Sequence, residues 1–182
     1  MGKKEFDEFL KTQPSFSTDL YKEKELREWR YYLDQLYTRI TSWLSDYEEK
    51  GIVKIVQGEK KIYEEFSGEY DINELVVSLY GKTIVFEPIG TMFFGAKGRV
   101  DIHGKNGTVS LCLVNQNLIE PNISLKIYTS EKERLLSETQ EKTEQVKPII
   151  WVWKIQLVGE KTRYIELDED NFFDILLELT NG

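Results

Sequence analysis

The chain has 182 residues, of which 40% are hydrophobic and 13% aromatic, and it carries a formal net charge of −8 with a pI near 4.9. This composition is too apolar for a disordered chain, and the length suits one domain with a single core. Because the acidic balance repels phosphate backbones, we expect no nucleic-acid partner and favour a basic one.

Cysteine usage and the shortness of the apolar runs predict a cytoplasmic protein. Cys112 is the only cysteine, so no disulfide can form within the chain, as is usual in a reducing compartment. Residues 1–6 are not followed by the apolar core of a secretory signal, so we expect no targeting segment. The longest apolar run, residues 149–153, is far shorter than the roughly 20 residues that span a bilayer, and we expect no membrane partner.

Residues 1–17 are expected to form an N-terminal arm with a small apolar cluster that Pro14 interrupts. A long helix follows, because apolar residues recur every three or four positions and the residues between them are polar. Its apolar stripe consists of Leu26, Trp29, Leu33, Leu36, Ile40, Trp43 and Tyr47. Ser17 or Thr18 can cap the start of this helix, and Gly51 ends it. The stripe is buried either against the protein's own sheet or against a second molecule, and the sequence leaves both open.

Beyond residue 52, apolar residues alternate with polar ones, and turn residues interrupt them at short intervals. This pattern predicts an antiparallel meander. The expected strands are residues 52–57, 61–66, 73–80, 83–88, 98–103, 108–114 and 124–129. The expected turns lie at Gly58, Ser67-Gly68, Gly81-Lys82 and Lys105-Asn106-Gly107.

The C-terminal part of the chain is expected to complete the sheet and add a short helix. Residues 131–145 are mostly charged, which predicts a solvated helix or a mobile excursion. Strands follow at 149–158 and 163–167, and Asp168 caps a helix that buries Phe172, Ile175, Leu176 and Leu179. We therefore predict a single α+β domain over residues 18–182, with a twisted antiparallel sheet of about six to nine strands, a long N-terminal amphipathic helix and a short C-terminal helix.

The segment Gly98-Arg99-Val100-Asp101-Ile102 resembles the metal-binding strand of restriction-type nuclease folds. In those folds the aspartate binds Mg²⁺, and the next strand supplies a Glu-x-Lys pair. Here the next strand, residues 109–114, contains neither an acid nor a lysine. The resemblance therefore covers five residues only, and an ordinary strand, with Asp101 exposed or hydrogen-bonded within a hairpin, is the favoured interpretation.

Residues 90–107 contain five of the twelve glycines. Lys97, Arg99 and Lys105 suggest an anion site here, because glycines let backbone N–H groups approach a phosphate or carboxylate closely. Hairpin geometry explains the same glycines, and we favour it because no phosphate-loop spacing is present. His103 is the only histidine, and Asp101 on the same strand face would orient it as a general base. If the protein is an enzyme, Asp101, His103 and Arg99 are its expected catalytic residues.

Trp151 and Trp153 lie on one face of an expected strand, with Ile155 beyond them. An exposed pair of indoles would stack sugars or bases. The other face of this strand is apolar as well, at Ile150 and Val152, so a central strand that is covered on both sides is the favoured interpretation.

The sequence assigns neither a cofactor nor a metal, because paired cysteines, a histidine cluster and a Gly-x-Ser-x-Gly elbow are all absent. We favour a non-enzymatic module that binds another protein, either a basic partner or a second copy of the chain, through the long helix or the acidic C-terminal region. An immunity-type inhibitor is one concrete form. The alternative is a small-ligand or metal-dependent phosphoester-acting enzyme that uses residues 90–107.

Overall fold

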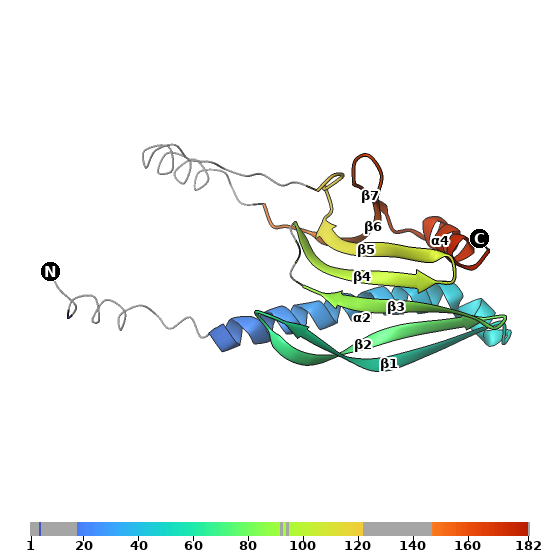
Figure 1. Cartoon of the computed structure of the whole chain (residues 1–182), viewed down its shortest axis with the longest axis horizontal. Helices are drawn as coiled ribbons and strands as arrows, with labels where there is room; N and C mark the ends of the chain where they lie inside the picture. Colours follow the sequence, from blue (N-terminus) through green and yellow to red (C-terminus); the bar gives the residue numbers. More distant parts are fainter. Residues whose placement is uncertain (1–3, 5–17, 92, 94, 122–146, 182) are drawn as a thin grey trace.

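The computed structural model describes residues 4, 18–91, 93, 95–121 and 147–181. They form a seven-stranded antiparallel sheet on which two helices pack (Figure 1), which confirms the expected α+β fold. The elements in chain order are α2 (Thr18–Glu49), β1 (Val53–Glu64), β2 (Gly68–Leu79), β3 (Lys82–Gly90), β4 (Ala96–Gly104), β5 (Gly107–Asn115), β6 (Trp151–Leu157), β7 (Arg163–Glu166) and α4 (Glu169–Asn181). Apart from Lys4, the predicted arm at 1–17 lies outside the described residues, as do the predicted strand at 124–129 and excursion at 131–145.

The sheet is a meander in which each strand pairs with the next one along the chain, in the order β1 to β7. The turns expected at Gly81 and at Asn106-Gly107 are confirmed. The turn expected at Gly58 is wrong, because residues 52–57 and 61–66 contribute to one continuous strand, β1. Gly58 lies opposite Glu74 of β2 in an unbroken register, and this pairing outweighs the local tendency of glycine to interrupt a strand.

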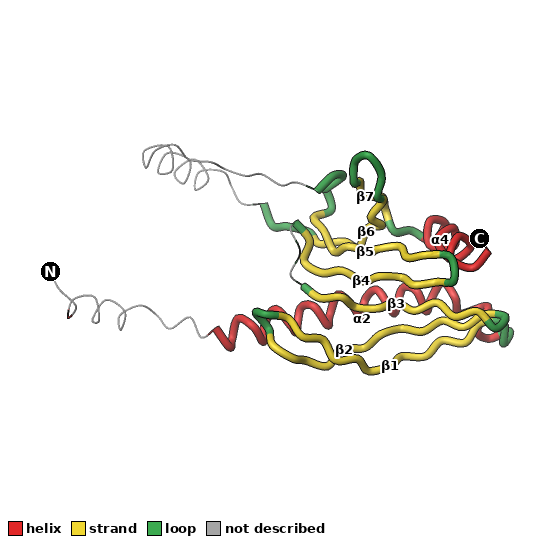
Figure 2. The backbone as a smooth tube through the Cα atoms, viewed as in Figure 1, coloured by secondary structure: helices red, strands yellow, loops and turns green. Residues whose placement is uncertain are grey.

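Both helices pack on the same face of the sheet. We call this helix-covered face the front face, although it is turned away from the viewer in Figure 2, where α2 runs along the strands behind them. The apolar stripe of α2 lies at the centre of the core, where Trp29, Leu33 and Ile40 are at most 1% exposed. These residues share one core cluster with Phe86 of β3. The long helix is therefore covered by the protein's own sheet. The last residue of the predicted stripe is an exception, because Tyr47 is 41% exposed.

Two helix ends, the end of α2 and the start of α4, have the capping residues that the sequence predicts, whereas Ser17 lies outside the described residues. Gly51 has a φ of +70°, and the Ile52 N–H donates to the Tyr47 carbonyl at 2.9 Å, which is the Schellman arrangement of a helix C-terminus. At the start of α4, the Asn171 N–H donates to Asp168 Oδ1 at 2.8 Å, as expected of an N-cap. The four apolar residues predicted for the inner side of α4 are all buried.

The opposite face of the sheet, the back face, is partly covered by residues 116–121. Beneath this segment lies Lys154 of β6, which is 3% exposed. Its Nζ donates to the carbonyl oxygens of Gln116 at 2.8 Å and Leu118 at 3.1 Å, and a carboxylate oxygen of Glu166 lies 3.0 Å away. The buried ammonium group thus has both a counter-charge and hydrogen-bond acceptors, which a lysine needs inside a protein.

Candidate functional site

The structure brings the three proposed catalytic residues together on the back face of β4. Arg99, Asp101 and His103 alternate along the strand and therefore share a face. Asp101, 8% exposed, accepts hydrogen bonds from Arg99 Nε at 2.7 Å, Arg99 Nη2 at 2.9 Å and Ser110 Oγ at 2.8 Å. The hydrogen bonds that Arg99 donates to the Asp101 carboxylate raise the pKa of Arg99 above its ordinary value. Both carboxylate oxygens of Asp101 are thus occupied by neighbours within the β4–β5 hairpin.

His103 belongs to a separate series of contacts. Its Nε2 lies 2.7 Å from Glu87 Oε2, and its Nδ1 lies 2.9 Å from Thr108 Oγ1. Glu87 also forms an ion pair with Lys60 of β1. The acid that orients His103 is therefore Glu87 on the neighbouring strand. The sequence predicts Asp101, on the same strand, as the orienting acid; the cross-strand register that selects Glu87 has no local signal in the sequence.

The environment of Asp101 fits the favoured interpretation of an aspartate that is hydrogen-bonded within a hairpin. Ser110 and Arg99 satisfy it, and β5 supplies no second carboxylate at the position that the nuclease resemblance requires. Within the described ranges, no three His, Cys, Asp or Glu side chains are grouped closely enough to hold a metal ion. The catalytic role of this group stays a prediction.

The three cations predicted to bind an anion do not form one cluster. Arg99 is held by Asp101 on the back face. Lys97 lies at a bulge of β4 and forms an ion pair with Glu28 of α2, on the front side. Lys105 lies in the β4–β5 turn, eight positions beyond Lys97, which is roughly 26 Å along an extended strand. The three residues therefore have separate partners and positions, and an anion site at any of them stays a prediction.

Cys112 is buried in β5 at 4% exposure, and burial raises the pKa of its thiol from 9.0 to about 11. Because the thiolate is the reactive form, we expect iodoacetamide at pH 8 to modify the folded protein at least about 100-fold more slowly than the urea-unfolded chain, as followed by mass spectrometry. The unfolded thiol ionises first as the pH rises, so this residue's contribution to stability is present below about pH 9 and is lost toward pH 11. Equal modification rates in the two states would contradict the buried position.

A different part of the molecule forms an apolar pocket of about 280 Å³, which we call the terminal pocket. It lies where the end of α2, the β2–β3 turn and α4 meet, and its lining includes Leu44, Tyr47, Ile52, Tyr80, Phe173 and Leu177. Three of these apolar side chains are well exposed, at 41% for Tyr47, 80% for Tyr80 and 56% for Leu177. Contiguous exposed apolar residues on a protein surface mark interaction sites.

The backbone of the β2–β3 turn is unusual at the edge of this pocket. Tyr80 and Gly81 have φ values of +46° and +75°, the geometry of a two-residue hairpin turn that favours Asn-Gly. A tyrosine in the left-handed region costs roughly 1 kcal/mol or more. The turn does not need this side chain, which projects into solvent beside the pocket.

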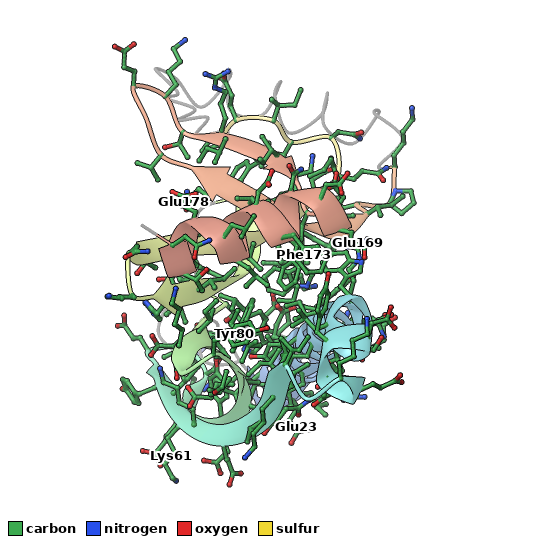
Figure 3. The ribbon with its side chains drawn as sticks, turned by 90° about the vertical axis from the view of Figure 1, so that its right-hand side faces the viewer. Glu23, Lys61, Tyr80, Glu169, Phe173 and Glu178 are labelled. Atoms are coloured by element: carbon green, nitrogen blue, oxygen red, sulfur yellow. The ribbon has the colours of Figure 1, made fainter. Side chains whose placement is uncertain are left out.

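Acidic side chains flank the terminal pocket along α4. This helix carries four exposed acids, Glu169, Asp170, Asp174 and Glu178, and no basic residue. Figure 3 faces this end of the molecule and shows Phe173 between Glu169 and Glu178 on α4, with Tyr80 on the neighbouring turn. A nearby cation, Lys82 of β3, donates a hydrogen bond from Nζ to the Thr180 carbonyl at 2.7 Å and keeps its positive charge. The α4 residues that line the pocket are uncharged, and the negative charge of this helix lies beside the pocket.

A functional assignment has to be based on the geometry of the structure, because comparisons with known proteins found no relative. The chain matches no protein-family model, no curated protein and no solved structure. Of the helices in the described part of the chain, none is both long and apolar enough to cross a membrane.

Proposed function

We propose that this protein is a non-enzymatic binding module that recognises a basic protein partner at the terminal pocket. The observation that carries the proposal is Tyr80, a large aromatic side chain that is 80% exposed in a turn whose backbone favours asparagine. Residues that violate local preferences without benefit to the fold are expected at functional sites. An immunity-type inhibitor of a basic protein is the concrete form that we favour.

The surroundings of Tyr80 support a protein partner. Tyrosines beside an apolar pocket are typical centres of binding energy in protein interfaces. The acids of α4 would attract a basic surface and accelerate its association. The sequence suggests two binding surfaces, the long helix and the acidic C-terminal region. Because the sheet covers the apolar stripe of α2, we favour the C-terminal region.

The enzymatic alternative has less support. It would depend on Asp101, His103 and Arg99, whose polar groups are hydrogen-bonded to one another or to neighbouring strands. The terminal pocket, by contrast, has exposed apolar side chains at its edge, and the turn that carries Tyr80 does not require an aromatic residue there. We therefore place the function at the terminal pocket.

The test is a Tyr80→Asn variant, because asparagine suits the turn and removes only the aromatic side chain. We expect its melting temperature to be equal or higher, and its affinity for the partner captured from native lysate to fall by at least about 30-fold. The measurements are thermal unfolding by circular dichroism and quantitative co-purification, followed by titration with the purified partner.

Tyr63→Thr is the matched control, because Tyr63 is also exposed, at 75%, but lies ten positions along β1 from Val53, about 33 Å from the pocket. It should bind like the wild type. Asp174→Asn with Glu178→Gln should slow association and flatten its salt dependence. Equal partner recovery with wild type and Tyr80→Asn would reject the proposal, as would a partner that is a second copy of this chain, detected as a dimer by light scattering.

A further inference from the structure

A second pocket lies at the opposite end of α2 and is chemically different from the terminal pocket. It has a volume of about 510 Å³, within the range of small-molecule sites. Its lining comes from the first half of α2, the start of β4 and the start of β6: Arg27, Glu28, Tyr31, Tyr32, Lys97 and Trp151. We call it the aromatic pocket, because three of its six lining residues carry aromatic rings.

The rings of the aromatic pocket are held in place by a fixed cation. Lys97 Nζ lies 5.5 Å from the centroid of the Trp151 ring and 6.0 Å from that of Tyr32, and it forms an ion pair with Glu28. Its side chain is only 17% exposed. Tyr31 stands edge-on to Tyr32 at 5.4 Å and is 58% exposed. Lys97 thus helps to position Trp151 and Tyr32 before a ligand binds, and Tyr32 in turn contacts Tyr31.

The aromatic pocket is locally basic in an acidic chain. Among described residues that line it or form ion pairs with its lining, Lys24, Arg27 and Lys97 are cationic and Glu28 alone is acidic. Lys24 and Arg27 lie one turn of α2 from each other and are both exposed, so they extend the positive charge along the rim. An anionic ligand is therefore favoured here, although the whole chain has a net charge of −8.

We propose that the aromatic pocket binds a nucleoside phosphate. The base would stack on Tyr31, which is 58% exposed, and contact the partly exposed edge of the Trp151 ring, whose face lies under Lys97. The phosphate would lie against Arg27, whose planar guanidinium forms paired hydrogen bonds with phosphate oxygens, and within reach of Lys24. A neutral sugar would use the rings but leave Arg27 without a partner, whereas Lys24 and Lys97 already pair with Glu28, so Arg27 favours the phosphate ester.

This site is independent of the terminal pocket and of the proposed protein partner. Both tryptophans pack on the core, as the favoured interpretation expects, but to different extents. Trp153 is 6% exposed and donates from Nε1 to the Tyr32 carbonyl at 3.0 Å, so it belongs to the core. Trp151 is partly exposed and lines the aromatic pocket.

The test is calorimetric titration of the intact protein with AMP, adenosine and ribose 5-phosphate. We expect AMP to bind at least about tenfold more tightly than either fragment, because only AMP uses both the rings and the cations. Arg27→Gln should weaken AMP about tenfold and leave adenosine unchanged. Trp151→Leu should weaken AMP and adenosine together, with its folded state checked by circular dichroism.

Two controls separate this proposal from the proposed function. Arg39→Gln removes an exposed cation of the same helix whose guanidinium lies over Trp43, and AMP affinity should not change. Tyr80→Asn should also bind AMP like the wild type. Absence of AMP binding at millimolar concentration would overturn the proposal. So would equal affinities for AMP and ribose 5-phosphate, or an Arg27→Gln variant that binds AMP like the wild type.

Discussion

Leu33→Asp is expected to unfold the protein. Leu33 is 1% exposed and lies in the core cluster formed by α2 and the front face of the sheet. The substitution removes a buried apolar side chain and places an unpaired carboxylate in its position, at a combined cost of at least about 4 kcal/mol. This is comparable with the whole stability of many domains of this size. Urea unfolding followed by circular dichroism measures the loss.

Gln35→Asp is the control for Leu33→Asp, because Gln35 is exposed on the same helix. The change there should alter the free energy of unfolding by less than about 0.5 kcal/mol. A Leu33→Asp protein that remains folded but changes its mass in light scattering would contradict the core position, because that behaviour indicates an interface between molecules.

Gly98→Ala is expected to cost about 3 kcal/mol of stability. Gly98 lies on β4 directly beneath the indole of Trp29, and a Cβ atom there would approach Trp29 Cζ3 to 2.3 Å and Cε3 to 2.7 Å. Trp29 has 0% exposure and is packed on all sides, so the ring has no space into which it can move. Denaturant titration should show a lower midpoint with an unchanged slope.

Gly58→Ala is the matched control in β1. A Cβ at that position would meet Glu74 at an ordinary distance of 3.5 Å, and alanine lowers the entropy of the unfolded chain. We expect it to be neutral or slightly stabilising. In a Trp29→Leu background, Gly98→Ala should cost at least about 1 kcal/mol less than in the wild type, since residues in contact are coupled. Additive effects would contradict the close approach of Gly98 to Trp29.

The fold follows from local patterns where those patterns agree with the packing. The three-four repeat of α2, the two-residue alternation of the strands and the Gly51 and Asp168 caps are each visible in a few neighbouring residues. The turn expected at Gly58 is wrong because the continuity of β1 depends on its register with β2, which no local pattern shows. The burial of Lys154 was not predicted either, since its carbonyl partners lie more than 35 positions away in the chain.

The sequence indicates the arrangement of candidate site residues only where they lie on one strand. Alternation along β4 places Asp101 and His103 on one face, as expected, and Arg99 lies on the same face. The terminal and aromatic pockets each combine side chains from a helix and at least two other parts of the chain, so no short segment indicates them. One local signal was available, because Tyr80 before Gly81 occupies a turn position where asparagine is usual.

The meander order also has a consequence for how quickly the chain reaches its native state. Every ladder in the sheet joins consecutive strands, and only the β5–β6 pair must close a connection as long as residues 116–150. Chains whose contacts are local in sequence fold faster than all-β proteins with distant pairings, because little loop entropy is lost before each contact forms. We therefore expect the hairpins from β1 to β5 to form first, and the addition of β6, β7 and α4 to be the slow step of folding.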